Sequence, residues 1–462
     1  MVTKYPDYDL SARNTFRMKV RCALYVEVTE EADLPALDWD ALPQPLMVIG
    51  GDSNLLFTAD FPGTVLHFAG SEPCPGVDKP SEGRATTAPE SSPAGEVGVI
   101  LGRGGILSCL PSPENVPSRG LGANNDGRGD SHEIPPRPLG PDSGGLLLAT
   151  VPAGSVFDDF CAWAAENGLW GPENLSLIPG ECGASAVQNI GAYGVEAKDI
   201  IAAIRAWDLQ ERRFVTIDPA DCAYGYRTSR FKTDWKGRFV ITAVTYRLSQ
   251  TPQPKLDYGG IRKALEARGV GTGAGISGHP RPDKREGPKE ARSAEYGRGR
   301  SEAEAIPAPV PAPRLTMEAE FPEGLPLTPQ LIRETIIDIR RKKLPDPAEK
   351  GSAGSFFCNP VISREHFARI VATAREENGP DYQVPHYEVG DQIKVPAAWM
   401  IEQCGFKGAT NGGAKVYENQ PLVIVNDSGE ASPEEIIGLE QRIIRTIEGK
   451  YGITLHPEVE HI

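Results

Sequence analysis

The chain has 462 residues, enough for two to four domains. Its formal net charge of −15 is spread along the sequence and argues against a nucleic-acid-binding protein. The eight cysteines show no CxxC spacing, so no metal site or redox dithiol is expected. With no apolar signal region and no run of about 18 apolar residues, we expect a soluble, reduced, cytoplasmic protein without a membrane partner. We also expect a monomer.

Two segments are too poor in apolar residues to form a core. They are residues 71–143, rich in Gly, Pro, Ser and Glu, and residues 269–313, which end in a proline-rich run. Neither can bury enough apolar surface to offset the entropy lost on ordering, so we expect two disordered insertions, with a short strand at Val97–Leu101. Three ordered blocks remain, at 5–70, 144–268 and 314–462.

The first block is predicted to consist of short strands joined by turns. An apolar strand at Pro45–Gly50 leads into the turn GDSNLLF, and a second strand follows at Thr64–Phe68. Glycines followed by Asp, Ser and Asn after a strand can expose backbone N–H groups to a phosphate. The third glycine and the long helix of a Rossmann turn are missing, so an ordinary turn between strands explains this stretch better when it is taken alone.

The second block combines strands with one helix, which indicates an α+β fold. A strand at Leu146–Gly154 precedes a helix that begins at Ser155, where Asp158 is placed to cap it, and that ends at Gly168. Three more strands are expected near the end of the block, at 200–209, 213–217 and 239–248.

The most informative stretch is Leu177–Asp199, LIPGECGASAVQNIGAYGVEAKD, called the glycine segment below. It holds four glycines, four alanines and few bulky aliphatic residues. Such a stretch cannot pack a core by itself. It suits a backbone that lies close against another group, such as a cofactor.

The third block contains two well-marked helices. One begins at Thr328 with Pro329 in its first turn and ends in the basic run Arg340–Lys343. The other begins at Ser432, where Glu435 completes a capping box.

Three separated polar residues are candidates for chemistry: Arg227 in YGYRTSRFK, Ser355 in GSAGSFFCNP and Glu458 in LHPEVE. Taken singly, each has a more ordinary explanation. Arg227 suits a structural ion pair, Ser355 a turn, and Glu458 a surface carboxylate.

The combination of these runs resembles the UDP-N-acetylenolpyruvoylglucosamine reductase (MurB) family. The matching runs occur in the family's order and cover all three ordered blocks while skipping both insertions. They are NTF, VIGGDSNLLF, PENLSLIPG, QNIGAYGVE, YGYRTSRFK, KLPDP, GSAGSFFCNP, AAWMIEQCGFKG and PEV. The run SFF, together with Tyr258 in LDYGGIR, resembles the type I form with a substrate-covering tyrosine loop.

The resemblance implies an α+β protein with an FAD-binding fold of the vanillyl-alcohol-oxidase (PCMH) type. Its two subdomains would be residues 5–70 and 144–255, followed by a tyrosine loop segment at 256–268 and a substrate domain at 314–462. The implied reaction is NADPH-dependent reduction of UDP-N-acetylglucosamine enolpyruvate to UDP-N-acetylmuramate in peptidoglycan precursor synthesis, with FAD as the cofactor.

The resemblance also implies roles for single residues. Arg227 and Glu458 would stabilise negative charge on the substrate carboxylate, with Glu458 protonated, and Ser355 would donate a proton to the alpha carbon. Substrate contacts would come from Tyr258, Arg340, Lys343, Asn359 and Gln420. Cofactor contacts would come from Gly50, Gly51, Asp52, Ser53, Asn54, Pro179, Gly180, Gly183, Ala184, Gln188, Asn189, Gly191, Ala192 and Gly194.

The sequence departs from the family pattern at several positions in the predicted cofactor site. Asp52 stands where a glycine is usual, and Glu181 stands where an uncharged polar residue is usual. Cys182 and Ala184 replace a small aliphatic residue and a serine, and Glu460 follows the terminal PEV near a common arginine position. These changes bear on FAD affinity and remove no predicted catalytic residue.

Two alternatives remain open from the sequence. One is another flavin oxidoreductase of the same fold, such as an oxidase that uses molecular oxygen. The other is a non-catalytic sugar-nucleotide sensor. The presence of Ser355, Arg227 and Glu458 together argues against both.

Overall fold

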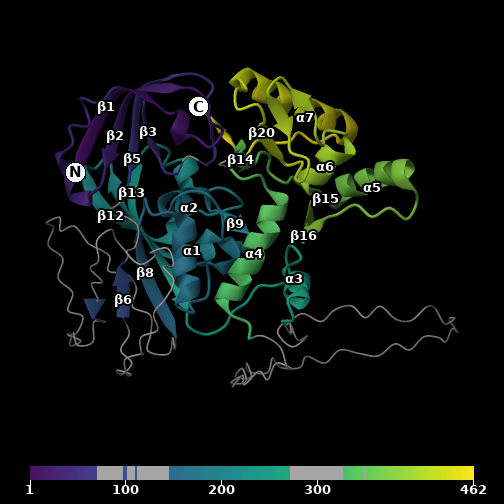
Figure 1. Ribbon diagram of the computed structural model, residues 1–462, viewed down its shortest axis with the longest axis horizontal. Helices are drawn as coiled ribbons and strands as arrows, with labels where there is room; N and C mark the ends of the chain where they lie inside the picture. The colour runs from purple at the N-terminus through teal and green to yellow at the C-terminus, as the bar shows by residue number, and fades with distance from the viewer. Residues whose placement is uncertain (52, 70–96, 101–109, 112–144, 271–325, 348) are drawn as a thin grey trace, which may run out of the picture. The chain divides into compact units, whose positions relative to one another are not determined.

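The computed structural model describes residues 1–51, 53–69, 97–100, 110–111, 145–270, 326–347 and 349–462. Contacts divide the chain into two units, one joining Met1–Ile261 to Thr328–Ile462 and the other formed by Arg262–Leu327. Helix α3 (Ile261–Ala267) accounts for most of the described part of the second unit. All elements discussed below belong to the first unit. Figure 1 shows the helices and strands of the chain.

The N-terminal strands form a four-stranded sheet in the order β1-β2-β5-β3. β1 and β2 are antiparallel, whereas β2 and β3 both run parallel to β5. Both faces of this sheet are buried along β2 and β5, because Tyr25 and Val65 enter one hydrophobic core and their neighbours Val26 and Leu66 enter the other. The strands span Val2–Asp9 (β1), Arg21–Val28 (β2), Leu46–Ile49 (β3) and Phe61–Phe68 (β5).

A second sheet, of six strands, has the order β12-β11-β13-β8-β6-β7. Its strands are antiparallel except for the pair β6 and β8. β6 coincides with the apolar patch expected as a short strand. Apart from β6 and β7, the predicted insertion at 71–143 lies outside the described residues, as does most of that at 269–313. The strands span Val97–Ile100 (β6), Leu110–Pro111 (β7), Leu146–Pro152 (β8), Ile201–Asp208 (β11), Arg213–Ile217 (β12) and Phe239–Ser249 (β13).

The C-terminal block packs helices on two small sheets, of order β14-β20-β19-β18 and β15-β17-β16. Its helices are α4 (Pro329–Lys343), α5 (Arg364–Asn378), α6 (Ala397–Gln403) and α7 (Pro433–Tyr451). Its strands are β14 (Gly351–Ser355), β15 (Val361–Ser363), β16 (Tyr387–Val389), β17 (Gln392–Lys394), β18 (Thr410–Asn411), β19 (Ala414–Val416) and β20 (Val423–Asn426). The predicted α+β class is confirmed, since helices and mainly antiparallel strands occupy separate layers.

Both helices expected in this block are present with their predicted caps. Thr328 accepts a hydrogen bond from the backbone of Leu331 at the start of α4, and Ser432 and Glu435 form the capping box of α7. The apolar face of α7 is fully buried between Ile436 and Ile447.

The predicted cap of the first helix is wrong. Helix α1 (Phe157–Glu166) has Val156 at its N-cap position and no side-chain cap. The Asp158 carboxylate instead accepts hydrogen bonds from the backbone of Leu177 and from Arg333. The Asp158 carboxylate therefore binds groups distant in sequence instead of the backbone of its own helix. The glycine segment also contains a short helix that was not predicted, α2 (Cys182–Gln188).

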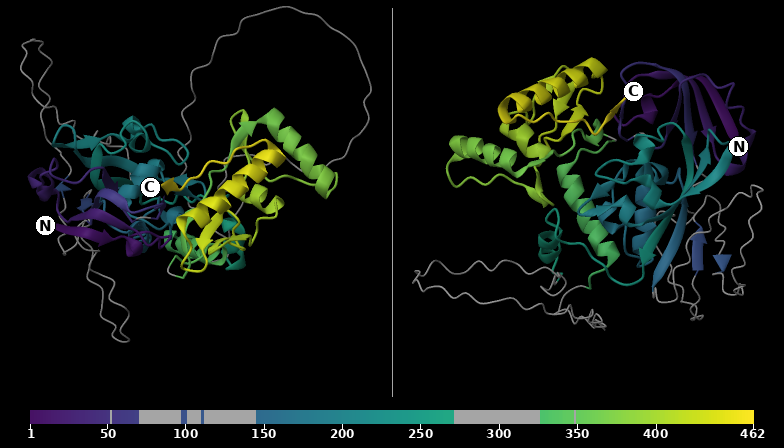
Figure 2. Two further views of the ribbon diagram at one scale, coloured as in Figure 1. Left: turned by 90° about the horizontal axis from the view of Figure 1, so that it is seen from above. Right: turned by 180° about the vertical axis from the view of Figure 1, so that it is seen from behind.

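The C-terminal strand returns to the beginning of the chain. β21 (Glu460–His461) pairs in parallel with β4 (Leu55–Leu56), the strand that follows the Gly50–Asn54 turn. Both views in Figure 2 show the end of the chain beside the N-terminal strands. This pairing brings the third block onto the turn predicted to bind the cofactor.

Candidate active site

Two glycine-containing stretches meet at the predicted cofactor site. A Cβ atom on Gly51, in the turn after β3, would lie only 2.8 Å from the Cα of Gly180, in the glycine segment. Ser53 fixes the contact, since its Oγ donates a hydrogen bond to the carbonyl oxygen of Pro179 at 3.1 Å. The two stretches therefore approach through their backbones, which explains the glycines. Asp52 lies outside the described residues.

Other small residues of the glycine segment also mark close contacts. A Cβ on Gly183 would lie 2.8 Å from the Cβ of Ala153. A Cβ on Gly194, whose φ is +81°, would lie 2.4 Å from the Tyr258 ring. Ala192 belongs to the short strand β9 (Gly191–Ala192), which pairs with β10 (Val195–Glu196).

The predicted cofactor residue Asn189 is engaged by the protein itself. Its Nδ2 donates to Glu196 at 3.0 Å and to the carbonyl oxygen of Gly225 at 2.8 Å. Its Oδ1 accepts the backbone N–H of Lys198 at 3.0 Å. With φ at +49°, Asn189 ends α2 and holds the turn that follows.

Asn54 joins the cofactor turn to the C-terminal strand. Its Nδ2 donates to the carbonyl oxygen of Glu458 at 2.9 Å, across 404 positions of sequence. Its own carbonyl oxygen accepts the backbone N–H of Glu460 at 3.0 Å. Glu458 is thereby fixed beside the turn, while the Glu460 carboxylate forms an ion pair with Lys236.

Arg227, Glu458 and Gln188 form one cluster. The Nε atom of Arg227 lies 3.1 Å from Oε1 of Glu458, which also accepts a hydrogen bond from Gln188 Nε2 at 3.1 Å. Arg227 also donates to the carbonyl oxygen of Gly191. A Cβ on Gly191 would lie 2.7 Å from the Arg227 guanidinium, so this glycine permits the contact.

Burial decides the protonation of the Glu458 carboxyl. Its side chain is 11% exposed. Burial raises the pKa of Glu458 above its usual 4.5, against the opposing attraction of Arg227 and Lys232 and the hydrogen bond from Gln188. The cluster therefore joins a fixed cation to a carboxyl group that retains its proton at higher pH than an exposed glutamate.

Ser355 ends strand β14 beside the segment that carries Glu458. Gly354, just before it, has φ at +72°, and Phe356, just after it, is fully buried. The Phe356 carbonyl oxygen accepts the backbone N–H of Glu458 at 2.8 Å. The buried phenylalanine thus anchors the strand, and the partly exposed Ser355 lies one residue from the bond that holds Glu458.

Two predicted substrate residues contact tyrosines that sequence reasoning missed. The Nδ2 of Asn359 donates to the hydroxyl of Tyr226 at 3.3 Å. The Arg340 guanidinium lies beside the Tyr193 hydroxyl, and burial lowers the pKa of Arg340. Among the described residues, the buried Nε of Arg340 has no hydrogen-bond partner. This donor is available to an anionic ligand.

Lys394 lies among aromatic rings near Asn359. Its Nζ is 5.1 Å from the ring centre of Tyr226 and 5.8 Å from that of Tyr387. The half-exposed Tyr258 stacks on Tyr387, with ring centres 6.4 Å apart. Tyr226 stands inside the run YGYRTSRFK, and Lys394 lies three residues before AAWMIEQCGFKG. Their closeness to runs that match the family was the only sequence feature that could have identified these two residues.

The structure does not bring Lys343 and Gln420 into this cluster by any side-chain contact. Lys343 is exposed at the end of α4, and Gln420 lies before β20. Within the described ranges, neither side chain forms a hydrogen bond or an ion pair, so both are free to meet a ligand.

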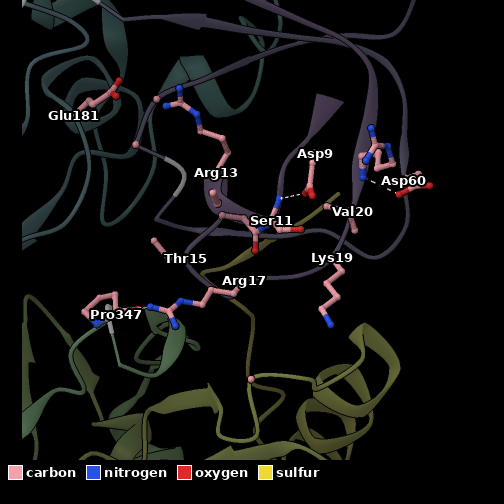
Figure 3. Close-up of a pocket in the computed structure, with 16 residues that line it drawn as sticks. Asp9, Ser11, Arg13, Thr15, Arg17, Lys19, Val20, Asp60, Glu181 and Pro347 are labelled. Atoms are coloured by element: carbon pink, nitrogen blue, oxygen red, sulfur yellow. Dashed lines mark hydrogen bonds between the residues drawn. The ribbon is translucent and has the colours of Figure 1, made fainter. Parts of the chain in front are cut away.

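A cavity of about 1190 Å³ adjoins the cofactor turn (Figure 3). Gly50, Gly51 and Glu181 line one side of it, and Arg13 and Asn14 extend the lining along the N-terminal segment. The wall is partly basic, which suits an anionic ligand next to the turn.

The unusual Glu181 borders this cavity and is held by His67. His67 Nε2 lies 2.9 Å from the Glu181 carboxylate, and a Cβ on Gly50 would lie 3.3 Å from the other Glu181 oxygen. Burial raises the pKa of Glu181, against the opposing hydrogen bond and charge of His67. Burial favours the neutral form of Glu181, which would present less negative charge to a phosphate. Cys182 and Ala184 are apolar contacts here, with Cys182 fully buried.

Among the residues that the structure describes, no group of three or more His, Cys, Asp or Glu side chains is placed to hold a metal ion. Among the same residues, no helix combines the length and apolar character needed to cross a membrane.

Comparison with known proteins relates this geometry to one family. A model described as UDP-N-acetylenolpyruvoylglucosamine reductase, C-terminal domain, matches residues 346–462, and a model described as FAD binding domain matches residues 144–215. A reductase of this name from Bacteroides fragilis is 32% identical over 98% of this chain and 99% of its own length. Another, from Porphyromonas gingivalis, is 34% identical over 99% of this chain and 98% of its own length.

The chain belongs to the UDP-N-acetylenolpyruvoylglucosamine reductase family. A crystal structure of the reductase from Thermus caldophilus covers 100% of this chain and 98% of its own, with a TM-score of 0.50 and 15% identity. That likeness concerns the fold alone. Together, the matches confirm the predicted family and the FAD-binding fold of the vanillyl-alcohol-oxidase type.

The residues at the glycine contact fit FAD. Gly51 and Ser53 donate no backbone hydrogen bond to another described residue outside the regular ladders, which leaves these N–H groups for phosphate oxygens. The Gly51–Gly180 contact excludes side chains, and the cavity with Arg13 lies next to it. Gly50, Gly51, Ser53 and the residues around Gly180 would therefore hold the dinucleotide.

We expect Gly51→Ala to weaken FAD binding, with the Kd rising roughly tenfold or more, because the new Cβ forces two backbones apart. Flavin absorbance per protein and fluorescence titration with FAD measure this. Gly449→Ala is the control, since a Cβ there meets nothing within 4 Å. An unchanged Kd for FAD in Gly51→Ala would show that the Gly51–Gly180 contact does not contribute to FAD binding.

Proposed function

We propose that this protein reduces UDP-N-acetylenolpyruvoylglucosamine to UDP-N-acetylmuramate with NADPH and bound FAD, a step of peptidoglycan precursor synthesis. Membership of the reductase family supports the reaction. The observation that carries the assignment is the ion pair of Arg227 and Glu458, held against Gln188 of the glycine segment. Bound FAD would supply the hydride chemistry.

Arg227 and Glu458 are proposed to stabilise charge on the substrate carboxylate. Hydride addition to the enolpyruvyl double bond moves electrons toward that carboxylate, and a preorganised cation and acid stabilise the resulting charge. Arg227 is fixed by Glu458 and Gly191, so it needs little reorganisation. The raised pKa of Glu458, caused first by burial, favours the acid form that can donate a hydrogen bond.

Ser355 is proposed to deliver the proton to the alpha carbon. A serine is a weak acid, so it must be placed accurately and must act beside groups that stabilise the developing anion. Its strand is anchored by buried Phe356 and joined to the Glu458 backbone, which supports both requirements.

The substrate is proposed to lie between α4 and the tyrosine cluster. Arg340 and Lys343 would meet its diphosphate or carboxylate, because both cations lack an anionic protein partner among the described residues. Asn359 and Gln420 would add polar contacts. Tyr258, half-exposed and stacked on Tyr387, would act as the covering tyrosine of the type I form.

The proposed partners are small molecules only, and the protein is proposed to act as a monomer in the cytoplasm. Light scattering of the purified protein and fractionation of cells check these two points.

The function is tested with the purified full chain. We expect a flavin absorption spectrum and sustained NADPH oxidation only when UDP-N-acetylenolpyruvoylglucosamine is present. NADPH oxidation driven by oxygen without that substrate would support another flavin oxidoreductase. Substrate binding without turnover would support a sugar-nucleotide sensor.

For Ser355→Ala we expect reduction of the flavin by NADPH to stay near the wild-type rate. Reduction of the enolpyruvyl substrate should fall by roughly two to four orders of magnitude, the usual contribution of a general acid. Stopped-flow measurement separates the two half-reactions. Ser428→Ala, in an exposed turn, is the control. Equal losses in both half-reactions would indicate a structural role for Ser355.

The substrate half-reaction should slow as pH rises through the pKa of Glu458. The functional acid form exists below that pKa, and burial places it above 4.5, so activity persists to higher pH than an exposed glutamate would allow. Single-turnover rates across pH measure this effect. Glu458→Gln should remove this pH limb, and its survival in that variant would assign the limb to another group.

A further inference from the structure

We propose that Asp158 and Arg333 form a positioning pair that fixes helix α4 to the start of the glycine segment. Through this pair, one carboxylate would set both substrate affinity and FAD retention. The inference rests on the proposed function, because it takes Arg340 and Lys343 as substrate contacts and the glycine segment as the cofactor cradle. Neither Asp158 nor Arg333 belongs to that set, and both act through other residues.

The Asp158 carboxylate serves two distant partners at once. Its Oδ1 accepts the backbone N–H of Leu177 at 2.5 Å and Nη1 of Arg333 at 2.5 Å, while its Oδ2 accepts Nη2 of Arg333 at 3.0 Å. This is a two-pronged guanidinium–carboxylate pair, the geometry that gives arginine its directional specificity. The side chains are only 22% and 11% exposed, so solvent screens the pair weakly.

The electrostatics agree with a permanently charged pair. Burial alone would raise the pKa of Asp158, but the hydrogen bonds from Arg333 and the Leu177 backbone outweigh it and hold the pKa below its usual value. The same pair raises the pKa of Arg333, against the effect of burial.

On one side, Asp158 holds the entrance of the glycine segment. Leu177 has φ at +60°, an unfavourable conformation for a leucine, so its backbone needs an outside constraint. The adjoining Phe157 donates its backbone N–H to the carbonyl oxygen of Gly180 at 3.0 Å. The first turn of α1 therefore binds the segment at Leu177 and at Gly180. Gly180 is also the residue that contacts Gly51.

On the other side, Arg333 sets the position of α4. Arg340 follows it by two helical turns, about 10 Å along the axis, and Lys343 follows one turn later. Arg340 lies beside Tyr193, near the far end of the glycine segment. Helix α4 thus contacts both ends of the segment, through Asp158 at Leu177 and directly at Tyr193. α1 and α4 lie side by side in Figures 1 and 2.

Two single variants separate the two tasks of Asp158. Arg333→Gln removes only the link to α4 and leaves the Leu177 bond. We expect the KM for UDP-N-acetylenolpyruvoylglucosamine to rise roughly ten- to a hundredfold, with the FAD dissociation rate near wild type. Asp158→Asn weakens both links, so KM and the FAD dissociation rate should both rise. Arg333→Lys keeps the charge without the planar fork and should restore part of the KM.

The chain contains a matched control for general loss of stability. Arg238, the residue before β13, forms a similar two-pronged pair with the buried Asp208 at the end of β11, with Nε donating to Oδ1 and Nη2 to Oδ2. Arg238→Gln should lower the melting temperature but leave KM and FAD release unchanged. FAD release is followed by flavin fluorescence and needs no turnover, so it remains informative even if the wild type fails to reduce the substrate.

The outcomes divide clearly. A KM increase in Arg333→Gln no larger than in Arg238→Gln would overturn the α4 link. Equal FAD release in Asp158→Asn and Arg333→Gln would overturn the separate grip on Leu177. If Arg333→Gln does not fold, the milder Arg333→Lys is compared with Arg238→Gln instead, and a KM no higher than in that control would overturn the α4 link. If the wild type itself lacks substrate-dependent NADPH oxidation, the proposed function fails, while the comparison of FAD release still stands.

Discussion

The site depends above all on the hydrogen bonds between Asn54 and the C-terminal strand. They bind the turn predicted to hold FAD to the segment that presents Glu458, and β4 and β21 extend the connection as a short parallel ladder. This junction helps to place Glu458 beside Arg227 and relates the segment next to Ser355 to the cofactor turn. Backbone and amide bonds of this kind define a geometry more tightly than contacts between flexible side chains do.

Local signals explain why much of the fold could be predicted. The N-terminal caps and apolar faces of α4 and α7 depend on residues three or four positions apart, and β3 and the second half of β5 are short, mainly apolar runs. The cap assigned to Asp158 failed because a backbone N–H and a guanidinium from distant segments competed for the same carboxylate. Helix α2 was not predicted because its small glycine and alanine residues, which permit close contact, do not form a clear apolar face at helical spacing.

The site was predictable in its residue types and less so in its connections. Arg227, Glu458 and Ser355 came from resemblance, and nothing in their spacing indicates that Gln188 would share the Glu458 oxygen with Arg227. Tyr226, Tyr193 and Lys394 were missed because single aromatic or basic residues carry no periodic signal. Glu181 departs from the family pattern in sequence, and only the structure shows that it is buried, which raises its pKa, and that it contacts His67.

The N-terminal sheet constrains how a ligand can enter. Its two faces belong to two different hydrophobic cores, one shared with the second block and one with the third. Moving either block away from this sheet would expose the apolar side chains on one of its faces. The free-energy cost would be about 25 cal/mol for every Å² uncovered. Separating the blocks would therefore cost free energy in proportion to the apolar area uncovered, whereas rotation of an exposed side chain such as Tyr258 uncovers little of either core. A ligand would therefore enter at less cost by displacing exposed side chains at the edge of the site than by separating the blocks.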